Sequence, residues 1–189
     1  MSTSFLIRTV PILDAIKSRL EAMTWTPTGG GAVLAFGQVI IFDLKDLASA
    51  LRELLAVEDR VALIVYEGDR WDNEANGQSL TSTLTREVTV IVSDRQLGDR
   101  SAATLGSTEN PGAYALADLV IESLHGPLTL RLADAMGAAR GRAWMQPLDG
   151  QPLLIEGQLR DQLVGRAAKV VRIEVRSGVI QSDIGQNRL

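Results

Sequence analysis

Apolar residues near the N-terminus recur at steps of three and four. The stripe consists of Val10, Leu13, Ile16, Leu20 and Met23. This spacing places the side chains on one face of a helix. Thr9 is a suitable N-cap, and Pro11 is tolerated in the first turn because its missing N–H needs no partner there. The pattern predicts a helix over about Thr9–Met23, ended by the proline- and glycine-containing stretch 24–31.

Two further elements follow in the first third of the chain. Residues 32–42 are apolar and rich in β-branched side chains, which indicates a short strand. Asp43 is a possible helix cap, and Asp46 lies favourably near the positive end of a helix. An apolar stripe follows at Leu44, Leu47, Ala48, Leu51, Leu54 and Leu55. We therefore expect a second helix over roughly 44–56.

The middle of the chain contains two strand patterns separated by polar sequence. Residues 61–66 form a continuous apolar run, which is typical of a central strand buried on both faces. Residues 84–92 alternate, and Arg86 is the one charged residue on the face of Val88 and Val90. The polar stretch 67–82 contains the turn-forming pair Asn76-Gly77, and it is predicted to be a long loop.

A second polar stretch precedes the best-delimited helix pattern. Residues 93–109 are too long for a tight connection and are also predicted to form a loop. Asn110 is expected to cap a helix whose first residue is Pro111 and which ends near Leu124, before Gly126-Pro127. Short strands are expected at 143–146 and 152–156. A clear alternation of Val171, Ile173 and Val175 with Arg172, Glu174 and Arg176 predicts a final strand.

This order of elements predicts an α+β fold with a mixed, mainly antiparallel sheet flanked by about three helices. A chain of 189 residues fits a single domain over 1–189. Apolar residues make up 46% and charged residues 22%, which is ordinary globular usage.

Charge and hydropathy exclude several classes of protein. The formal net charge is −4 and no run of five Lys or Arg occurs, so tight sequence-specific nucleic-acid binding is not expected. The alternative that a weakly acidic surface lets nucleic acid move past without binding it is not excluded by the charge. The apolar runs are shorter than the 18 to 20 residues of a membrane span, and no secretory signal is expected.

The sequence offers little catalytic chemistry. The absence of cysteine rules out disulfides, thiolate catalysis and cysteine-based zinc sites. Gly29-Gly30-Gly31 lacks the Lys-Ser or Lys-Thr of a phosphate loop, and the sole histidine, His125, lies where a helix C-terminus favours a cation. Asp69, Asp72 and Glu74 lack the order of a calcium loop, and no serine has the surroundings of a triad nucleophile. We therefore predict no catalytic, cofactor-binding or metal-binding residue and no enzymatic activity.

The three tryptophans are candidates for protein contacts. Aromatic side chains on polar or glycine-rich segments often anchor interfaces. The alternative is that Trp25, Trp71 and Trp144 each fill the edge of the protein's own core. Both interpretations are open for all three, and Trp71 lies in the most polar surroundings.

The order of elements resembles the tail-terminator and tail-completion proteins of long-tailed phages, particularly the Mu-like type. The resemblance covers most of the chain and rests on the helix at 10–16, the strands at 61–66 and 85–92, the helix at 114–124 and the strand at 169–175. It implies a homohexameric ring that caps the tail tube and joins it to a neck or head-completion protein. DNA would pass through only as cargo. The protein would be made in the host cytoplasm and end in the tail or neck region of the virion.

Under this resemblance, residues 67–82 and 95–109 of the predicted loops are candidates for contacts with the tube, a neighbouring subunit or the neck, since ring closure needs two different patches on each subunit. The candidate interface residues are Arg70, Trp71, Asp72, Arg95 and Arg100. A head-completion or neck connector protein is an alternative, separable by its partners. A small-molecule-binding domain or an enzyme with an unrecognised site is another, separable by the presence of a deep apolar pocket.

Overall fold

The fold is built on a twisted sheet whose strands are connected mainly by hairpins. The computed structural model describes residues 3–4, 9–42, 60–76, 79–95, 100–132, 139–152 and 166–183. In these residues the helices are α1 (Thr9–Glu21), α3 (Arg100–Leu105) and α4 (Gly112–Ser123). The strands of the main sheet are β1 (Thr3–Ser4), β4 (Gln38–Phe42), β5 (Arg60–Asn76), β6 (Ser79–Arg95), β7 (Gly126–Leu132), β8 (Ala139–Pro152) and β9 (Arg166–Asp183). A separate small hairpin pairs β2 (Thr24–Trp25) with β3 (Val33–Leu34).

The main sheet has the strand order β4-β5-β6-β9-β8-β7, with β1 pairing β9 at its far end. β5, β6, β9, β8 and β7 pair antiparallel, and only β4 runs parallel to its neighbour β5. The predicted α+β class with a mixed, mainly antiparallel sheet is therefore confirmed.

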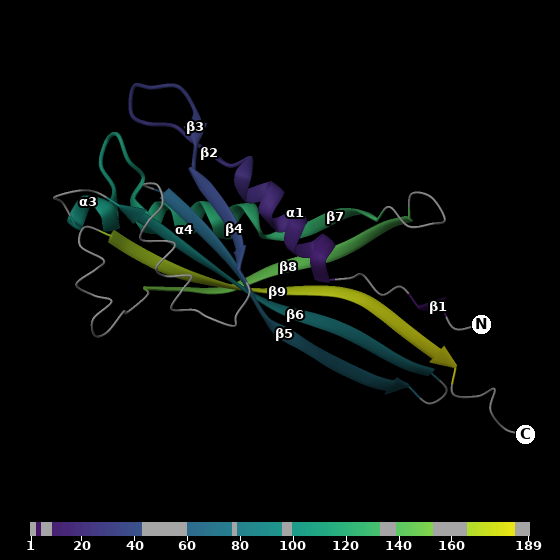
Figure 1. Ribbon diagram of the computed structural model, residues 1–189. Helices are drawn as coiled ribbons and strands as arrows, with labels where there is room; N and C mark the ends of the chain where they lie inside the picture. The colour runs from purple at the N-terminus through teal and green to yellow at the C-terminus, as the bar shows by residue number, and fades with distance from the viewer. Residues whose placement is uncertain are drawn as a thin grey trace, which may run out of the picture.

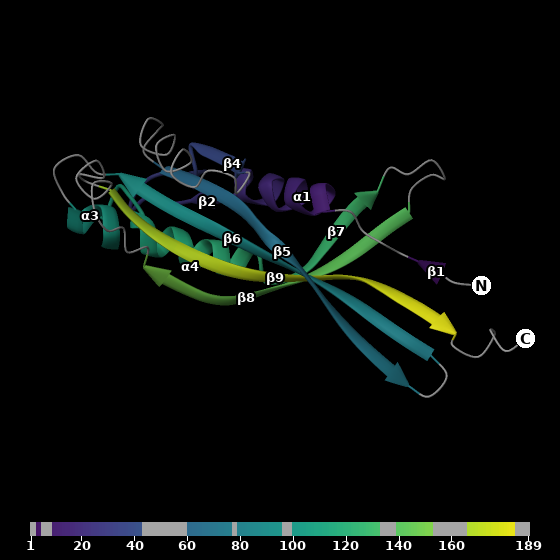
Figure 2. The same ribbon diagram turned by 60° about the horizontal axis from the view of Figure 1, so that its bottom comes forward.

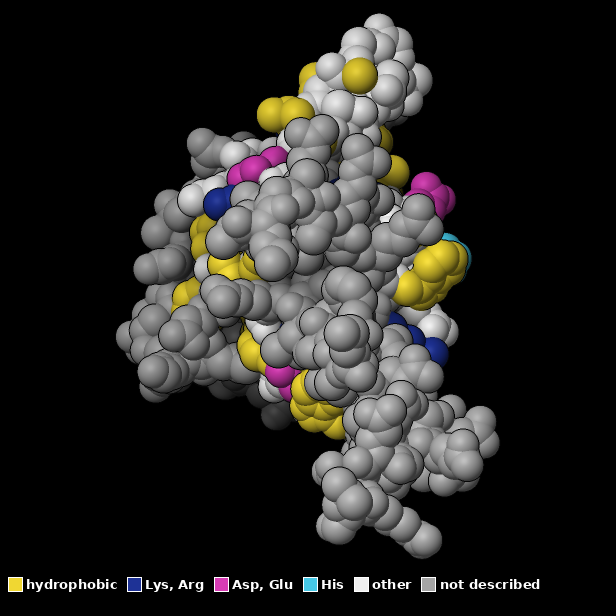
Figure 3. All heavy atoms as spheres, turned by 90° about the vertical axis from the view of Figure 1, so that its right-hand side faces the viewer, with side chains coloured by type: hydrophobic (Ala, Val, Ile, Leu, Met, Phe, Trp, Pro, Cys, Tyr) yellow, Lys and Arg dark blue, Asp and Glu magenta, His cyan; other side chains and the backbone are white. Residues whose placement is uncertain are grey.

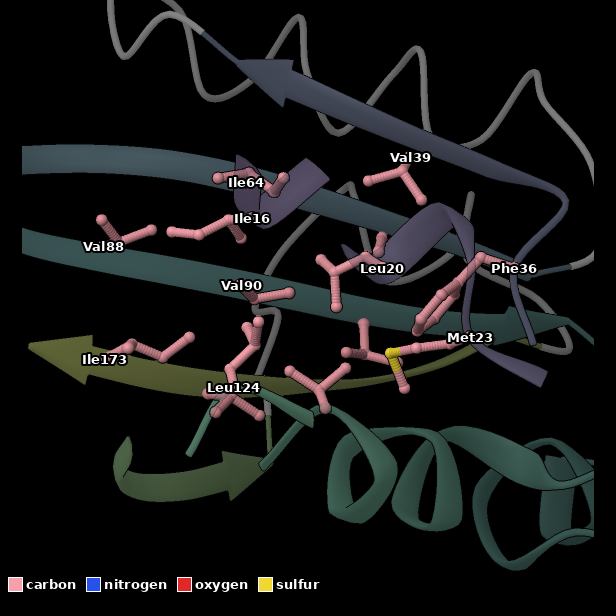
Figure 4. Close-up of a cluster of buried hydrophobic side chains, with 14 of the residues drawn as sticks. Ile16, Leu20, Met23, Phe36, Val39, Ile64, Val88, Val90, Leu124 and Ile173 are labelled. Atoms are coloured by element: carbon pink, nitrogen blue, oxygen red, sulfur yellow. The ribbon is translucent and has the colours of Figure 1, made fainter. Parts of the chain in front are cut away.

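Helices α1 and α4 pack on one face of the sheet and enclose the larger core (Figure 1; Figure 4). The inward residues of α1 are Ile12, Leu13, Ile16 and Leu20. They meet alternate strand residues, among them Ile64, Val90 and Ile173, and the buried Leu124 after α4. Alternation along the strands and helical spacing in α1 thus bring apolar side chains to one layer.

The opposite face of the sheet carries a second apolar cluster. It contains Val61, Leu63 and Val65 of β5 and Ile91 of β6, with Ile40 and Phe42 of β4 packed against it. Every side chain from Val61 to Val65 is buried. The prediction that this run is a central strand buried on both faces is confirmed.

Two predicted helices coincide with α1 and α4, but the expected cap of α4 is wrong. Pro111 occupies the position just before the helix, and no side chain caps it. The Asn110 amide instead donates to the carboxylate of the buried Asp94. This charge-assisted hydrogen bond turns the Asn110 side chain toward Asp94, and its amide oxygen does not cap the helix. The helix predicted over 44–56 lies outside the described residues, as does 153–156.

The predicted loop over 67–82 is also wrong. β5 and β6 remain paired from Arg60↔Asp94 to Asn76↔Ser79, so that only residues 77–78 separate two strands of 17 residues each. Strand pairing needs backbone hydrogen bonds rather than apolar side chains, so a polar, threonine-rich sequence with a turn-forming pair continues the hairpin. The apolar pattern of a sequence reports burial, so it does not indicate that the pairing of β5 with β6 continues through this polar stretch.

The predicted loop over 93–109 is wrong in part. Arg95 is the last residue of β6, and Arg100 begins helix α3. Residues 106–110 connect α3 to α4 without regular structure, and Ser107 N–H donates to the Asn110 carbonyl oxygen at 2.7 Å. The strand expected over 32–42 is divided between β3 and β4, with Ala35 N–H bonded to the Met23 carbonyl oxygen at 2.8 Å.

Candidate assembly interface

Strands β5, β6 and β9 extend beyond the part of the sheet that the helices cover (Figure 1; Figure 2). We call residues 68–76, 79–87 and 174–183 the arm, and the remainder of these three strands the body. The inner end of the arm, with Arg86 and Val175, still lies under the start of α1 or in the larger core. Strands of 17 and 18 residues are about twice the length of most strands in globular proteins. The β7–β8 hairpin projects on the same side and diverges from the arm (Figure 2). Within the described residues, the molecule therefore ends in two strand projections.

Arg70 lies among three carboxylates on the arm. Its guanidinium nitrogens lie 3.1 Å from Glu174 Oε1, 3.3 Å from Glu87 Oε1 and 3.7 Å from Asp72 Oδ1. The hydrogen bond that Arg70 donates to Glu174, together with the negative charge of that carboxylate, raises the pKa of Arg70 above its ordinary value. Arg70 thus crosslinks all three strands of the arm, because its partners come from β5, β6 and β9.

The ion pairs continue across β9 to β8. Arg176 Nη2 lies 3.3 Å from Glu174 Oε2. Arg172 Nε donates to Asp149 Oδ1 at 3.0 Å, and its Nη2 donates to the other oxygen of the same carboxylate. This two-point contact raises the pKa of Arg172. We call the set Arg70, Asp72, Glu87, Asp149, Arg172, Glu174 and Arg176 the charged strip.

The strip lies on the sheet face opposite α1, as the ladder register requires. Val88, Ile173 and Tyr66 pair with one another and pack in or against the helix-covered core, so Glu87 and Glu174, one residue along, belong to the other face. Most of the strip is exposed, but the Glu174 side chain is only 10% exposed. Glu174 is therefore the least exposed charged side chain of the strip, and both Arg70 and Arg176 contact it.

On the helix-covered face, Arg86 is buried beneath the start of α1. Its Nε donates to Thr9 Oγ1 at 3.1 Å and lies 3.6 Å from Asp69 Oδ1. Burial lowers the pKa of Arg86, which the charge of Asp69 partly offsets. Burial and a hydrogen bond with Asp69 raise the pKa of Tyr66. The prediction that Arg86 lies on the inward face of residues 84–92, with Val88 and Val90, is confirmed.

The structure brings together two of the five predicted interface residues. Arg70 and Asp72 belong to the charged strip, whereas Trp71 pairs with Leu84 on the other face and is 43% exposed. Arg95 lies ten residues along β6 from Thr85, the partner of Arg70, which is about 33 Å at the rise of an extended strand. Arg100 begins α3 beyond the same end of β6. The five residues therefore do not form one patch, and their role in assembly stays a prediction.

Sequence reasoning missed the partners of Arg70. The sequence pattern assigns Glu174 only to the polar side of its strand, and it singles out neither Glu87 nor Asp149. The available signal was the alternation in β9, where Arg172, Glu174 and Arg176 share the face opposite Val171, Ile173 and Val175. Three charges of alternating sign on one strand face indicate cross-strand partners of opposite sign.

The tryptophans divide between the two interpretations. Trp25 packs against the larger core, so the core interpretation is confirmed for it. Trp144 of β8 is 51% exposed and Trp71 is 43% exposed, so neither is enclosed by the described core. Val33 and Leu34 are exposed on the β2–β3 hairpin, which stands out at the top of Figure 3 with apolar side chains on its surface.

Searches for other kinds of site give limited results. Among the described residues, no three or more acidic or histidine side chains come close enough to hold a metal ion. None of the helices in that part of the chain has the length and apolar character needed to cross a membrane.

Comparisons with known proteins assign no family. No family model matches the chain, and no curated protein matches it. A chain from a solved structure described as the virion of a native gene transfer agent particle is similar over 63% of this chain and 69% of that chain. The two share 14% sequence identity with a TM-score of 0.31. A similarity at this level assigns neither a family nor a function to this chain.

Proposed function

We propose that this protein is a structural component of a virus particle that caps the tail tube as a ring and joins the tail to the neck or head. The proposal starts from the order of elements, in which α1, the buried strand β5, the alternating strand β6, α4 and the closing strand β9 follow one another as in tail terminators. It also takes account of the arm, which the sequence alone did not predict.

The observation that carries the proposal is the arm with its charged strip. The apolar side chains that stabilise the body form the core under the helices and the smaller cluster on the opposite face, whereas most of the strip consists of ion pairs on strands that continue past the helices (Figure 2). Exposed ion pairs contribute only about 0–1 kcal/mol each to stability, so folding alone gives little reason for such long strands. A projecting sheet with ordered charges is suited to contact with other subunits.

The charge of the chain fits DNA as a passing cargo. The formal net charge is −4. The cations of the strip are each paired with carboxylates, so they offer few free positive charges to a phosphate backbone. A ring of such subunits would let DNA slide through without holding it.

Inactivating the gene in a particle-producing genome tests the proposal. The expected result, seen by negative-stain electron microscopy, is filled heads separated from tails whose tubes vary in length. Supplying the protein in trans should restore joined particles. Intact infectious particles without the protein would contradict the proposal. Tails of normal length that fail to attach, with pull-down of portal-side proteins but not of tube protein, would favour the neck connector instead.

A further inference from the structure

Both projections of the sheet have an edge with no strand partner among the described residues. β4 pairs with β5 only over Val61–Val65, so β5 has β6 on one side and an open edge on the other from Tyr66 onward. β7 pairs with β8 on one side only. The Pro127 carbonyl oxygen of β7 accepts from Arg19 Nη2 at 3.3 Å, so its open part begins at Leu128. Figures 1 and 2 show β5 along the margin of the arm and β7 along the margin of its hairpin.

The two open edges lie at the same level of the ladder. Leu128 pairs with Ala143, Ala143 with Ser177, Ser177 with Leu84, and Leu84 with Trp71. Leu128, where the open part of β7 begins, therefore lies at the level of Trp71 of β5. Each strand from β5 to β7 runs antiparallel to the next, so β5 and β7 run in the same sense along the sheet, although the β7–β8 hairpin diverges from the arm (Figure 2). A second copy that is rotated to bring the two diverging edges together would place β7 beside β5 as parallel strands.

The two edges carry opposite charge. The open part of β5 and its flank contains Glu67, Asp69, Asp72 and Glu74 with one arginine, Arg70. β7 and the paired part of β8 contain Arg131, Arg140 and Arg142 and no acidic residue. Residues alternate between the two faces of the sheet on either side of the level that Leu128 and Trp71 share. By this count, Asp72 and Glu74 occupy strand positions on the same face as the three arginines.

We infer that the open β5 edge of one subunit pairs with β7 of a second copy of this chain, head to tail, with the acidic β5 positions against the arginines of the β7–β8 hairpin. A two-fold dimer would instead pair β5 with β5 and place like charges opposite one another, which is destabilising. Pairing of unlike edges repeats from subunit to subunit and closes into a ring when the rotation permits. The inference deepens the proposed function, because it names the contact that would close the ring.

Disulfide trapping tests the pairing directly, since the chain has no cysteine of its own. The double variant Asp72→Cys with Thr129→Cys places thiols at one height on the two edges, and Asp72→Cys with Arg131→Cys allows for a stagger of two residues. Mild oxidation of concentrated full-length protein should give a ladder of covalent oligomers on a denaturing gel for at least one double variant. Each single variant should stay monomeric. A dimer from Asp72→Cys alone, or no ladder from either double variant, overturns the inference.

Charge reversal in trans distinguishes head-to-tail from two-fold pairing. Asp72→Lys and Arg142→Glu should each raise the concentration needed for half-association about tenfold, measured by sedimentation velocity. Mixing the two variants should restore association, because each altered edge then meets an altered partner of opposite charge. Asp14→Lys and Lys17→Glu change charges on α1, which belongs to neither open edge, and they are matched controls expected to change nothing.

The trapping and charge-reversal experiments test the edge pairing separately from the proposed role in the virus particle. Association that is unaffected by both reversals, with no disulfide ladder, overturns the edge pairing and leaves the particle role to the gene-inactivation experiment. A ladder together with restoration in trans supports the edge pairing, whatever particles form without the gene.

Discussion

The body and the arm are halves of the same three strands, stabilised in different ways. In the body, β5 is buried on both faces from Val61 to Val65, and the neighbouring Val90 and Val171 are fully buried. In the arm, Leu84, Arg86 and Val175 are buried on one face, while the other face carries the charged strip. Burying one large apolar side chain contributes about 1.5–3 kcal/mol, against about 0–1 kcal/mol for an exposed ion pair. A continuous ladder therefore joins a stable half to a less stable one.

The largest effect should come from removing a side chain of the body. Ile64→Ala leaves a cavity in the larger core, where Ile64 is fully buried (Figure 4), and should lower the free energy of unfolding by about 3–4 kcal/mol. Trp71→Ala in the arm removes a larger side chain that is 43% exposed, and it should cost about 1 kcal/mol. Urea denaturation followed by circular dichroism measures both. Equal losses would show that the arm is as tightly packed as the body.

Substitution of glycine compares the free space at the base of the arm with that at the corner between α3 and α4. Gly112, at the start of α4, has φ +73°, and a Cβ there would lie 2.3 Å from the backbone nitrogen of Gly106. Gly68, beside the bulge of β5, has φ +153° with open space around it. Both alanine variants carry backbone strain of about 1–2 kcal/mol, but only Gly112→Ala adds a clash with backbone that cannot move aside.

We therefore expect Gly112→Ala to lose about 3 kcal/mol and Gly68→Ala about 1 kcal/mol. Thermal unfolding of the two variants at one protein concentration provides the measurement. A Gly68→Ala variant as unstable as Gly112→Ala would mean that the base of the arm is as constrained as the corner between α3 and α4.

The same contrast explains what the sequence could predict. Burial leaves a periodic signal, so α1, α4, the strand at 61–65 and the alternation at 84–92 were found near their observed places. The inward position of Arg86 followed from that alternation. The arm was missed because its strands continue by backbone hydrogen bonds, which leave no apolar pattern in 67–82.

The candidate site was predicted in part for the same reason. Arg70 and Asp72 could be chosen as exposed charges, but their partners Glu87 and Glu174 lie 17 and 104 residues away from Arg70. Only the strand register brings these residues together. That register depends on the β5–β6 hairpin, where the sequence pattern predicts a loop. The sequence pattern does not indicate helix α3, because its six residues are too few to show a helical period.

Two aspartates on β5 offer a comparison of the two faces of the arm. Asp69 partly offsets the buried charge of Arg86, whereas Asp72 pairs with the exposed Arg70 at 3.7 Å. Asp69→Asn should cost about 1–2 kcal/mol of unfolding free energy, because a buried guanidinium loses one of its negatively charged neighbours. Asp72→Asn should cost at most about 0.5 kcal/mol. Denaturant midpoints at low and high salt measure both, and salt should reduce only the effect of Asp72→Asn.

The smallest effect concerns Tyr66, where the body meets the arm. Burial, together with Asp69, raises the pKa of Tyr66 above 10.0. A raised pKa in the folded state means that the folded protein holds this proton longer than the unfolded chain. The resulting stability is complete below pH 10 and is lost as the pH rises through the folded pKa. Stability should therefore fall above pH 10 more steeply in the wild type than in Tyr66→Phe.

The phenolate absorbance of the wild type minus that of Tyr66→Phe isolates this titration from Tyr114, the other tyrosine of the chain. Its midpoint should lie above 10.0 in the folded protein and move to the ordinary tyrosine value in denaturant. Asp69→Asn should lower the folded midpoint without bringing it to the denatured value, since burial, the larger cause, stays. If Asp69→Asn leaves the midpoint unchanged, burial alone raises the pKa of Tyr66, and the Asp69 carboxylate acts on Arg86 and not on Tyr66.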